Sequence, residues 1–275
     1  MKQLLLLLLA GTFLIQVSCV NPQENTHKET LVKIETSYGD LTVKLYNQTP
    51  VHRDNFIKLA SEGFYDGLLF HRVINNFMIQ GGDPDSKTAQ AGQRLGGGDP
   101  GYTLPAEIDS SLFHKRGVLA AARRGGPSNP EKRSSGSQFY IVQGTVFTDG
   151  ALDTLEMKIH MQRQKMLIQK HFAAARNELD QLRQAGNQDQ FNIRTAEIRE
   201  EANAELETLS GINIVPERRE AYTTIGGYPS LDQEYTIFGE VVEGLNVLDK
   251  IATVETDQFD RPVTDIKMKV KVLDQ

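Results

Sequence analysis

The sequence contains only one cysteine, Cys19, so no disulfide bond can form within the chain. Basic residues are also outnumbered by acidic ones: the chain has 30 Lys and Arg and 36 Asp and Glu, which gives a formal net charge of −6. Such a chain lacks the basic surface that holds nucleic-acid phosphates, so nucleic acid is not expected as a partner. With 39% hydrophobic residues, its 275 residues can form one large or two small domains with a buried core.

Several signatures of metal, phosphate and nucleophile chemistry are missing. The six histidines are scattered and form no HExxH, and the glycine-rich stretches contain no GK[ST] that would hold phosphates. Ser137 lies in GSQF rather than in the GxSxG turn that exposes a nucleophilic serine. His71 could act as a general base, but a hydrogen-bonded structural role is the simpler interpretation. We therefore expect no metal site and no cofactor.

The first 19 residues have the layout of a secretory signal peptide. Lys2 precedes an apolar run over residues 4–15, and small residues follow before Cys19. That run is shorter than the roughly 20 residues that a membrane-spanning helix requires. The pattern therefore predicts an exported protein.

Cys19 resembles the lipidated cysteine of a bacterial lipoprotein. Val17 and Ser18 fit the cleavage site of that class, whereas Gln16 departs from it, since an aliphatic residue is usual there. The alternative is an ordinary signal peptide with a leftover cysteine. The resemblance implies a location in the bacterial periplasm or cell envelope, with a lipid anchor on Cys19. Residues 20–29 have too little apolar surface to fold and are predicted to be a flexible tether.

Alternating apolar and polar residues predict short strands in much of the chain. Such alternation flanks Gly39, which is typical of a β-hairpin. Thr49 and Pro50 can begin a helix that buries Phe56, and Gly63 would end it. Further β-like runs follow, separated by glycine-rich loops. This arrangement favours a barrel or a sandwich.

The character of the sequence changes near residue 147. Residues 152–209 contain no proline and one glycine, Gly186, and are rich in good helix formers. Two helices are predicted, over residues 152–185 and 188–209. A helical block inside a β domain is most simply an insertion, with the β domain made of two discontinuous pieces.

Charge predicts how these two helices pair. The first is mainly basic and the second mainly acidic, so they should form an antiparallel hairpin that stands off the β domain. Folding at Gly186 and Asn187 would bring Glu197 opposite Arg176, and Glu205 and Glu207 toward Lys165 and Lys170. The hairpin could be a solvated spacer, or an arm that holds an unfolded client or a second copy of the protein.

The stretch LFHRVINNFMIQGGD, residues 69–83, places charge inside an apolar run. Arg72 is costly to bury on a strand without a partner, so we expect it to open into a groove. Phe77 and Met78 offer apolar contact, and Gln80 offers one amide that can bond a peptide backbone. This composition suits an extended peptide ligand.

Three separated groups of motifs occur in a fixed order: FHRVI with FMIQGGD, then SGSQFYIV, then TIFGEVVEGLNVLDKI. Together they resemble the cyclophilin family of peptidyl-prolyl isomerases. The resemblance implies a mainly β fold, an eight-stranded antiparallel closed β-barrel capped by two helices, here with the helical hairpin inserted. The predicted organisation is a signal peptide (1–19), a tether (20–29), a first barrel segment (30–146), the helical insertion (147–216) and a second barrel segment (217–275).

The resemblance also implies roles for individual residues. Arg72 corresponds to the catalytic arginine of the family, and Gln80 to its backbone-binding glutamine. The implied substrate-binding residues are Phe77, Met78, Gln80, Ala122, Gln138, Tyr140, Leu231 and Tyr235.

Four positions depart from the best-known members of the family. Tyr140 stands where phenylalanine is common, Tyr235 where a pocket histidine is common, and Arg123 replaces a small polar residue. Ser230 stands where a tryptophan often lies, and the chain has no tryptophan. The last departure implies weak binding of the cyclic peptide cyclosporin.

These residues imply a peptidyl-prolyl cis-trans isomerase (EC 5.2.1.8) that assists the folding of exported polypeptides. Its implied partners are unfolded or flexible proline-containing chains. The alternative is a non-catalytic peptide-binding or assembly module that uses the helical insertion as its interface, by self-association or client contact.

Overall fold

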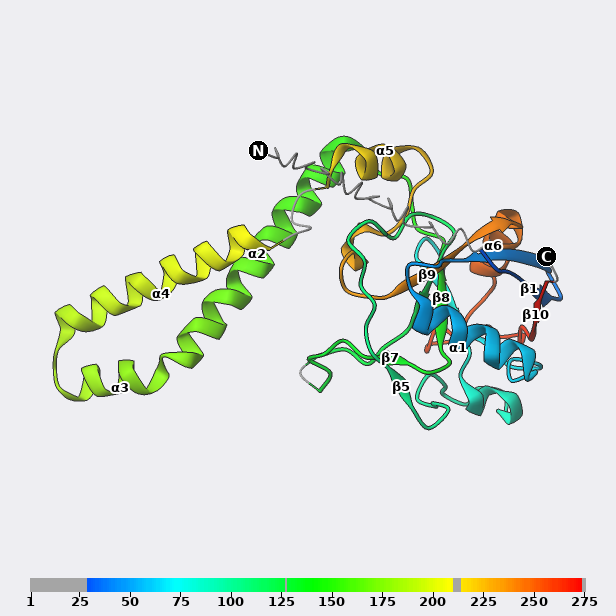
Figure 1. Cartoon of the computed structure of the whole chain (residues 1–275), viewed down its shortest axis with the longest axis horizontal. Coiled ribbons are helices and arrows are strands. Elements are labelled where there is room, and N and C mark those ends of the chain that lie inside the picture. Colours follow the sequence, from blue (N-terminus) through cyan, green and yellow to red (C-terminus); the bar gives the residue numbers. More distant parts are fainter. Residues whose placement is uncertain (1–28, 127, 210–213, 274–275) are drawn as a thin grey trace, which may run out of the picture.

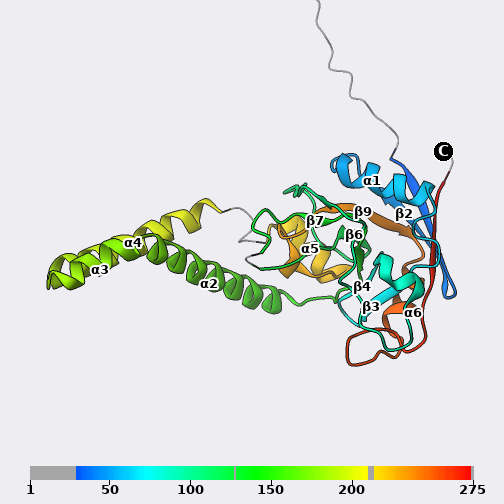
Figure 2. The ribbon, with the colours of Figure 1, turned by 90° about the horizontal axis from the view of Figure 1, so that it is seen from below.

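The computed structural model describes residues 29–126, 128–209 and 214–273, so the predicted signal peptide and Cys19 lie outside the described residues. The described chain forms a β domain and a helical arm that extends away from it (Figures 1 and 2). The arm interrupts the β domain between residues 142 and 237.

Eight strands form one antiparallel sheet in the order β10-β1-β2-β9-β6-β8-β4-β3. They are β1 (Leu31–Thr36), β2 (Gly39–Leu45), β3 (Phe70–Ile74), β4 (Met78–Gly81), β6 (Val118–Ala121), β8 (Phe139–Val142), β9 (Ile237–Glu243) and β10 (Met268–Val272). A two-stranded ribbon, β5 (Thr103–Leu104) with β7 (Ser134–Ser135), lies in the loops. The strand number and the antiparallel pairing agree with the prediction.

The sheet curls strongly but does not close, so the predicted closed barrel is wrong on this point. The edge strands β3 and β10 form no ladder, and the edges meet at an isolated bridge between Leu69 and Lys267, beside which Met268 donates its N–H to the carbonyl of Leu68 at 2.8 Å. Val73 of β3 donates its N–H to the carbonyl of Asp260 at 2.8 Å. The loop before β10 therefore occupies the edge of β3 that a closed barrel would pair with β10.

Two helices cover the sheet, as predicted. α1 (Pro50–Ser61) buries Phe56 in the main core, and α6 (Leu245–Ala252) buries Leu248 and Ile251, which lie on one face of the helix at a spacing of three. The packing of both helices leaves the other face of the sheet free for the site.

The alternation of β8 separates two apolar clusters. Phe139 and Ile141 belong to the main core beneath the helices, whereas Tyr140 and Val142 belong to a second cluster. Successive residues of a strand point to opposite faces, so this second cluster lies on the outer face of the curled sheet.

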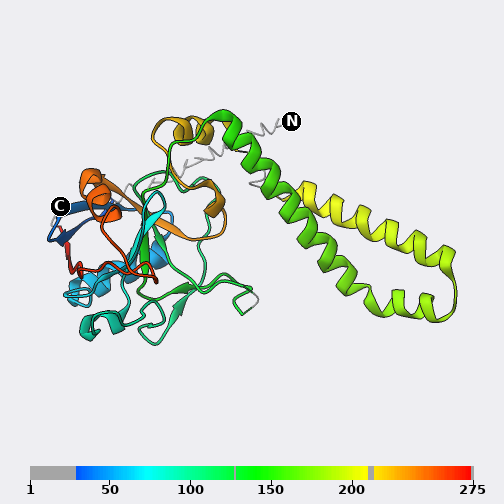
Figure 3. The ribbon, with the colours of Figure 1, turned by 180° about the vertical axis from the view of Figure 1, so that it is seen from behind.

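The arm consists of α2 (Asp149–Ala174), α3 (Arg176–Gln184) and α4 (Gln188–Thr208), with α4 packed along α2 (Figure 3). The predicted first helix is therefore divided at Ala175. Buried Ala175 and Leu179 pack against Ile198 of α4, so the break allows α3 to stay in contact with α4.

One of the predicted charge pairs is confirmed. Lys170 lies 2.7 Å from Glu205 across the hairpin. The predicted Glu197–Arg176 pair is wrong, because Glu197 contacts Arg194 at 3.3 Å within α4. Arg176 begins α3 immediately after the break and pairs within its own helix.

α5 (Pro216–Thr224) is a helix that we did not predict, since we assigned the chain from residue 217 onward to the barrel. Pro216 at the first helical position is the signal that could have revealed it. α5 lies at the base of the arm (Figure 1), where Arg219 contacts Glu156 of α2 at 2.6 Å.

Candidate active site

The antiparallel register places four side chains in one row across the sheet. Arg72 of β3 is opposite Gln80 of β4, Gln80 is opposite Tyr140 of β8, and Tyr140 is opposite Ala120 of β6. Directly opposed residues share a face. Strand pairing therefore brings Arg72, Gln80 and Tyr140 together on the outer face.

A pocket of about 120 Å³ opens on this face. Its lining residues are Arg72, Phe77, Met78, Gln80, Ala122, Arg123, Tyr140, Leu231 and Tyr235. Eight of the nine predicted site residues line it, and Arg123 joins them. The ninth, Gln138, lines the neighbouring cavity instead.

Aromatic and apolar side chains form part of the pocket wall, beside the polar groups of Arg72, Gln80 and Arg123. Phe77 packs against Tyr228 with ring centroids 4.3 Å apart, and Tyr235 meets Tyr140 edge-on at 5.6 Å. Burial raises the pKa of Tyr140 well above its usual range, so this phenol stays neutral. These packed rings form a preformed wall that suits a small apolar ring.

Strand β3 is irregular next to Arg72. Regular strand alternation would place Phe70 on the same face as Arg72, but Phe70 lies in the main core with Val73. The register between β3 and β4 shifts between Phe70 and Arg72, so His71 is an extra residue in the ladder. This bulge allows Arg72 to face outward while residues on both sides of it point inward.

His71 is buried, as a structural histidine should be, but neither ring nitrogen has a hydrogen-bond partner within the described residues. Burial lowers the pKa of His71 to about 4 against the opposing attraction of Asp83. The ring is neutral near pH 7 and is not exposed on the face of Arg72.

Arg72 has a partner that we did not anticipate. Its Nε lies 3.3 Å from the carboxylate of Asp260, a residue 188 positions away in the sequence. Asp260 adopts a φ of 63°, the left-handed region that aspartate tolerates better than most residues. The carboxylate holds one edge of the guanidinium. Both side chains are about two-fifths exposed, so the guanidinium remains accessible from the groove.

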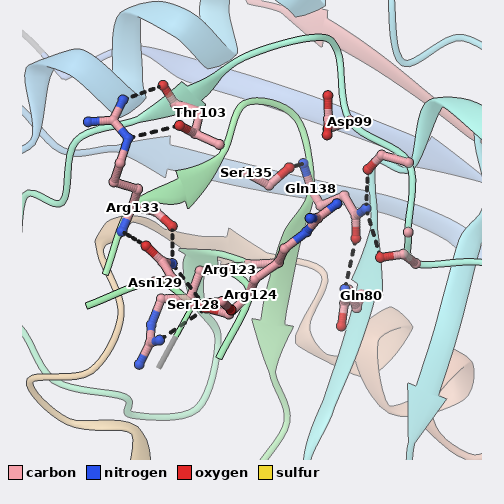
Figure 4. Close-up of a pocket in the computed structure, with 14 residues that line it drawn as sticks. Gln80, Asp99, Thr103, Arg123, Arg124, Ser128, Asn129, Arg133, Ser135 and Gln138 are labelled. Carbon is pink, nitrogen blue, oxygen red and sulfur yellow. Dashed lines mark hydrogen bonds between the residues drawn. The ribbon is translucent and has the colours of Figure 1, made fainter. Parts of the chain in front are cut away.

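Gln138 connects the pocket to a second cavity of about 380 Å³ (Figure 4). Gln80 donates to the side-chain oxygen of Gln138 at 3.0 Å, and Gln138 in turn donates to the carbonyl of Gly98 at 2.6 Å. Across this cavity Arg133 donates to Thr103 at 2.9 Å. The two cavities are therefore neighbours on the same face, and they share Gln80, Ala122 and Arg123 as lining residues.

Arg123 closes the wall between the two cavities. It donates to the carbonyl of Glu234 at 2.8 Å and to the Glu234 carboxylate at 3.0 Å. Its guanidinium also lies 4.6 Å from the ring centroid of Tyr235. Arg123 and Tyr235, two of the positions that depart from the best-known family members, therefore pack against each other.

The arrangement suits a ligand with a small apolar ring and a polar backbone. The pocket can hold the ring, the amide of Gln80 can bond a carbonyl, and Arg72 can donate to an atom that gains a lone pair. Among the described residues, no three His, Cys, Asp or Glu side chains are grouped so as to hold a metal ion. Within the same described ranges, no helix combines the length and apolar character needed to cross a membrane.

Comparison with protein families identifies one match over most of the chain. The model of the family described as cyclophilin type peptidyl-prolyl cis-trans isomerase matches residues 31–162 and 172–272. Both pieces of the β domain and much of the arm fall within these limits.

Individual relatives agree with the family match. A predicted peptidyl-prolyl cis-trans isomerase of Staphylococcus aureus (strain USA300) is 32% identical over 239 residues, 86% of this chain and 88% of that protein. A predicted bifunctional phosphatase/peptidyl-prolyl cis-trans isomerase of Streptococcus pyogenes is 32% identical over 87% of this chain, but over 38% of its own length.

A solved structure shares the fold. It is a cyclophilin type peptidyl-prolyl cis-trans isomerase of Cryptosporidium parvum, with a TM-score of 0.51 and 21% sequence identity. The match covers 90% of this chain and 99% of that one.

Proposed function

Because the chain belongs to the cyclophilin-type peptidyl-prolyl cis-trans isomerases and is therefore an isomerase of X–Pro bonds, we propose that it catalyses this rotation in the Arg72 pocket, on exported polypeptides. The observation that carries the proposed site is the convergence of eight implied residues on one pocket of about 120 Å³. These residues come from positions 72 to 235, and strand pairing brings them together.

The reaction needs stabilisation of a twisted amide. Rotation about the X–Pro bond faces a barrier of about 18–20 kcal/mol, because amide resonance is lost at the midpoint. There the proline nitrogen becomes pyramidal and gains a lone pair. Arg72, always charged and rigid in its donor geometry, donates to that nitrogen in the twisted state more strongly than in either planar state.

The other pocket residues hold the peptide while the bond turns. Phe77, Met78 and Leu231 enclose the proline ring, and Gln80 bonds the substrate backbone beside it. Asp260 holds Arg72 from the side away from the substrate. Binding energy from the ring and the backbone therefore fixes one side of the amide while the other side rotates.

The location that we propose is outside the cytoplasm, on a lipid anchor at Cys19. The support is the sequence of the first 19 residues, where an apolar run over residues 4–15 is followed by the only cysteine of the sequence, Cys19. A lipid on Cys19 would tether the β domain through the polar segment 20–29. A single acyl chain binds membranes only weakly, so stable anchoring requires more than one chain.

Expression of the full chain in a bacterium tests this location. The unsubstituted protein should incorporate labelled palmitate and sediment with membranes, whereas Cys19→Ser should remain unlabelled and stay in the soluble exported fraction. Ser18→Ala serves as the control and should keep the label, since small residues are acceptable before the lipidated cysteine. An unlabelled parent chain would contradict the anchor without affecting the isomerase assignment.

We further propose that the arm holds unfolded clients near the pocket. Three methionines of α2 carry this second proposal, because Met157, Met161 and Met166 are each more than half exposed. Flexible, polarisable methionines suit surfaces that bind varied partners. Arg72 in its pocket favours an arm that assists the enzyme over the alternative of a non-catalytic assembly module.

Replacing residues 152–209 with a short Gly/Ser linker should separate the two activities. Isomerisation of a short X-Pro-Phe peptide should stay within about twofold of the parent, because the pocket and α5 are retained. Refolding of a protein substrate whose rate is limited by proline isomerisation should slow by about tenfold, because the arm no longer raises the effective concentration of the client at the pocket.

A point variant gives the matched comparison for this deletion. The triple replacement of Met157, Met161 and Met166 by glutamine should also slow protein refolding. Val263→Gln changes an equally exposed apolar residue of the β domain and should have no effect. If the deletion variant matches the parent chain in its rates on both the short peptide and the protein substrate, the arm is only a spacer.

A further inference from the structure

The wall of the proline pocket is bonded to a buried histidine. Tyr140, 5% exposed on β8, places its hydroxyl 2.9 Å from Nε2 of His114, which is fully buried. The two rings are nearly parallel, with an angle of 10° between their planes. The hydroxyl that distinguishes Tyr140 from phenylalanine therefore points away from the pocket, into the protein.

A buried carboxylate holds the other side of this histidine. Asp232 Oδ1 accepts from the backbone N–H of His114 at 2.8 Å and lies 3.1 Å from its Nδ1. Asp232 follows Leu231, another residue of the pocket wall. Two walls of the pocket, Tyr140 and Leu231, are thus joined behind it by one polar connection.

The connection continues into the helix at the base of the arm. Tyr222 of α5, also fully buried, donates its hydroxyl to Asp232 Oδ2 at 2.8 Å, and Arg218 of α5 lies 3.6 Å from the same oxygen. α5 is in turn held to α2 by Arg219, which contacts Asp153 at 2.9 Å. An unbroken set of contacts therefore runs from the arm to the pocket.

The donor and acceptor inventory sets the direction of each bond. An ionised Asp232 can accept only, so His114 carries its proton on Nδ1 and donates it to that carboxylate. In a ring that carries this proton alone, Nε2 is an acceptor to which the Tyr140 hydroxyl donates. Each ring nitrogen of His114 has one partner in the set, so loss of the Tyr140 hydroxyl or of the Asp232 carboxylate leaves a buried nitrogen unsatisfied, whereas loss of the Tyr222 hydroxyl removes one of the groups that hold Asp232 in place.

We propose that Tyr222, Asp232 and His114 are positioning residues that let α5 set the shape of the proline pocket through Tyr140. None of the three lines the pocket. Tyr222 acts by fixing the rotamer of Asp232, which fixes the plane of His114 and hence the ring of Tyr140. The inference rests on the proposed assignment of that pocket to the substrate proline.

Tyr222→Phe in the full chain tests the proposal, because it removes one hydroxyl and keeps the ring that packs under α5. KM for an X–Pro peptide should rise about fivefold, the factor that corresponds to one hydrogen bond, with kcat nearly unchanged. A looser wall weakens binding of the ring in the planar and twisted states alike, and such uniform loss appears in KM.

Tyr65→Phe is the matched control. Tyr65 is equally buried and donates to the carbonyl of Ser137 at 3.3 Å, so its loss should lower the melting temperature without altering KM. Combining Tyr222→Phe with Tyr140→Phe should change KM by less than the product of the separate effects, because both act on one connection. Independent, multiplicative effects would overturn the proposal.

A measurement on the unsubstituted protein removes any dependence on the folding of a variant. Ring ¹⁵N spectra should show His114 protonated on Nδ1 alone, and saturation with the peptide should shift its Nε2 resonance although no peptide touches it. An Nε2-protonated ring, or resonances that ignore the peptide, would overturn the proposal. If Arg72→Ala retains full activity, the site assignment fails; if it is inactive while Tyr222→Phe keeps its KM, only the positioning role fails.

Discussion

Arg72→Ala should lower kcat/KM for X–Pro isomerisation by about 10²-fold, or about 3 kcal/mol, as the loss of one oriented transition-state donor does in other enzymes. The effect should fall on kcat, because the guanidinium acts on the nitrogen only when the bond is twisted. Folding should be almost unaffected, since the Arg72–Asp260 pair is exposed and such pairs contribute about 0–1 kcal/mol to stability. A protease-coupled assay on an X-Pro-Phe peptide measures the rate.

Arg72→Lys is the matched comparison. It keeps the charge but loses the planar set of donors that lets Asp260 hold one edge while another faces the substrate. Its activity should lie between those of the parent and Arg72→Ala. Full activity in Arg72→Ala would show that the proline nitrogen meets some other donor, and the mechanism would fail.

Ser230→Trp should strengthen cyclosporin binding by about 30-fold or more, since one large aromatic contact at a binding hot spot contributes roughly 2–4 kcal/mol. Ser230 is exposed on the short helix Pro229–Leu231, and its neighbour Leu231 lines the pocket. A tryptophan at this rim has open space and can cover the apolar side of the ligand. Calorimetric titration of the parent and the variant measures the difference.

Ser61→Trp controls for added aromatic surface. Ser61 is exposed at the end of α1 and is not among the lining residues of either cavity, so its substitution should leave cyclosporin affinity unchanged. Equal affinity of Ser230→Trp and the parent would mean that position 230 does not correspond to the family tryptophan.

Local pattern was sufficient for most of the elements. Alternation marked the strands, and continuous helix formers without proline marked the arm, because both signals depend on residues close in sequence. The same signals were too weak for α5, a single short helix, and they gave no warning of the break at Ala175, where contact with Ile198 decides the path.

The motifs of the sequence also determined which side chains meet. Arg72, Phe77, Met78 and Gln80 are close neighbours in the chain, whereas Tyr140 was named through the family resemblance and is brought to them by the pairing of β4 with β8. A hydrophobic strand pattern largely specifies register, since a slip by one residue would expose the buried face. The resemblance of the motifs to a known family, rather than local pattern, therefore predicted the composition of the pocket.

Tertiary structure decided what holds those side chains in place. The Arg72–Asp260 pair, the backbone bond from Val73 to Asp260 and the Tyr140–His114 bond join residues that no local pattern relates. Each depends on the path of a loop or on a bulge, and loops are positioned by many distant contacts rather than by their own propensities. Sequence can name the groups that do the chemistry, whereas their orientation depends on partners that only the folded chain brings near.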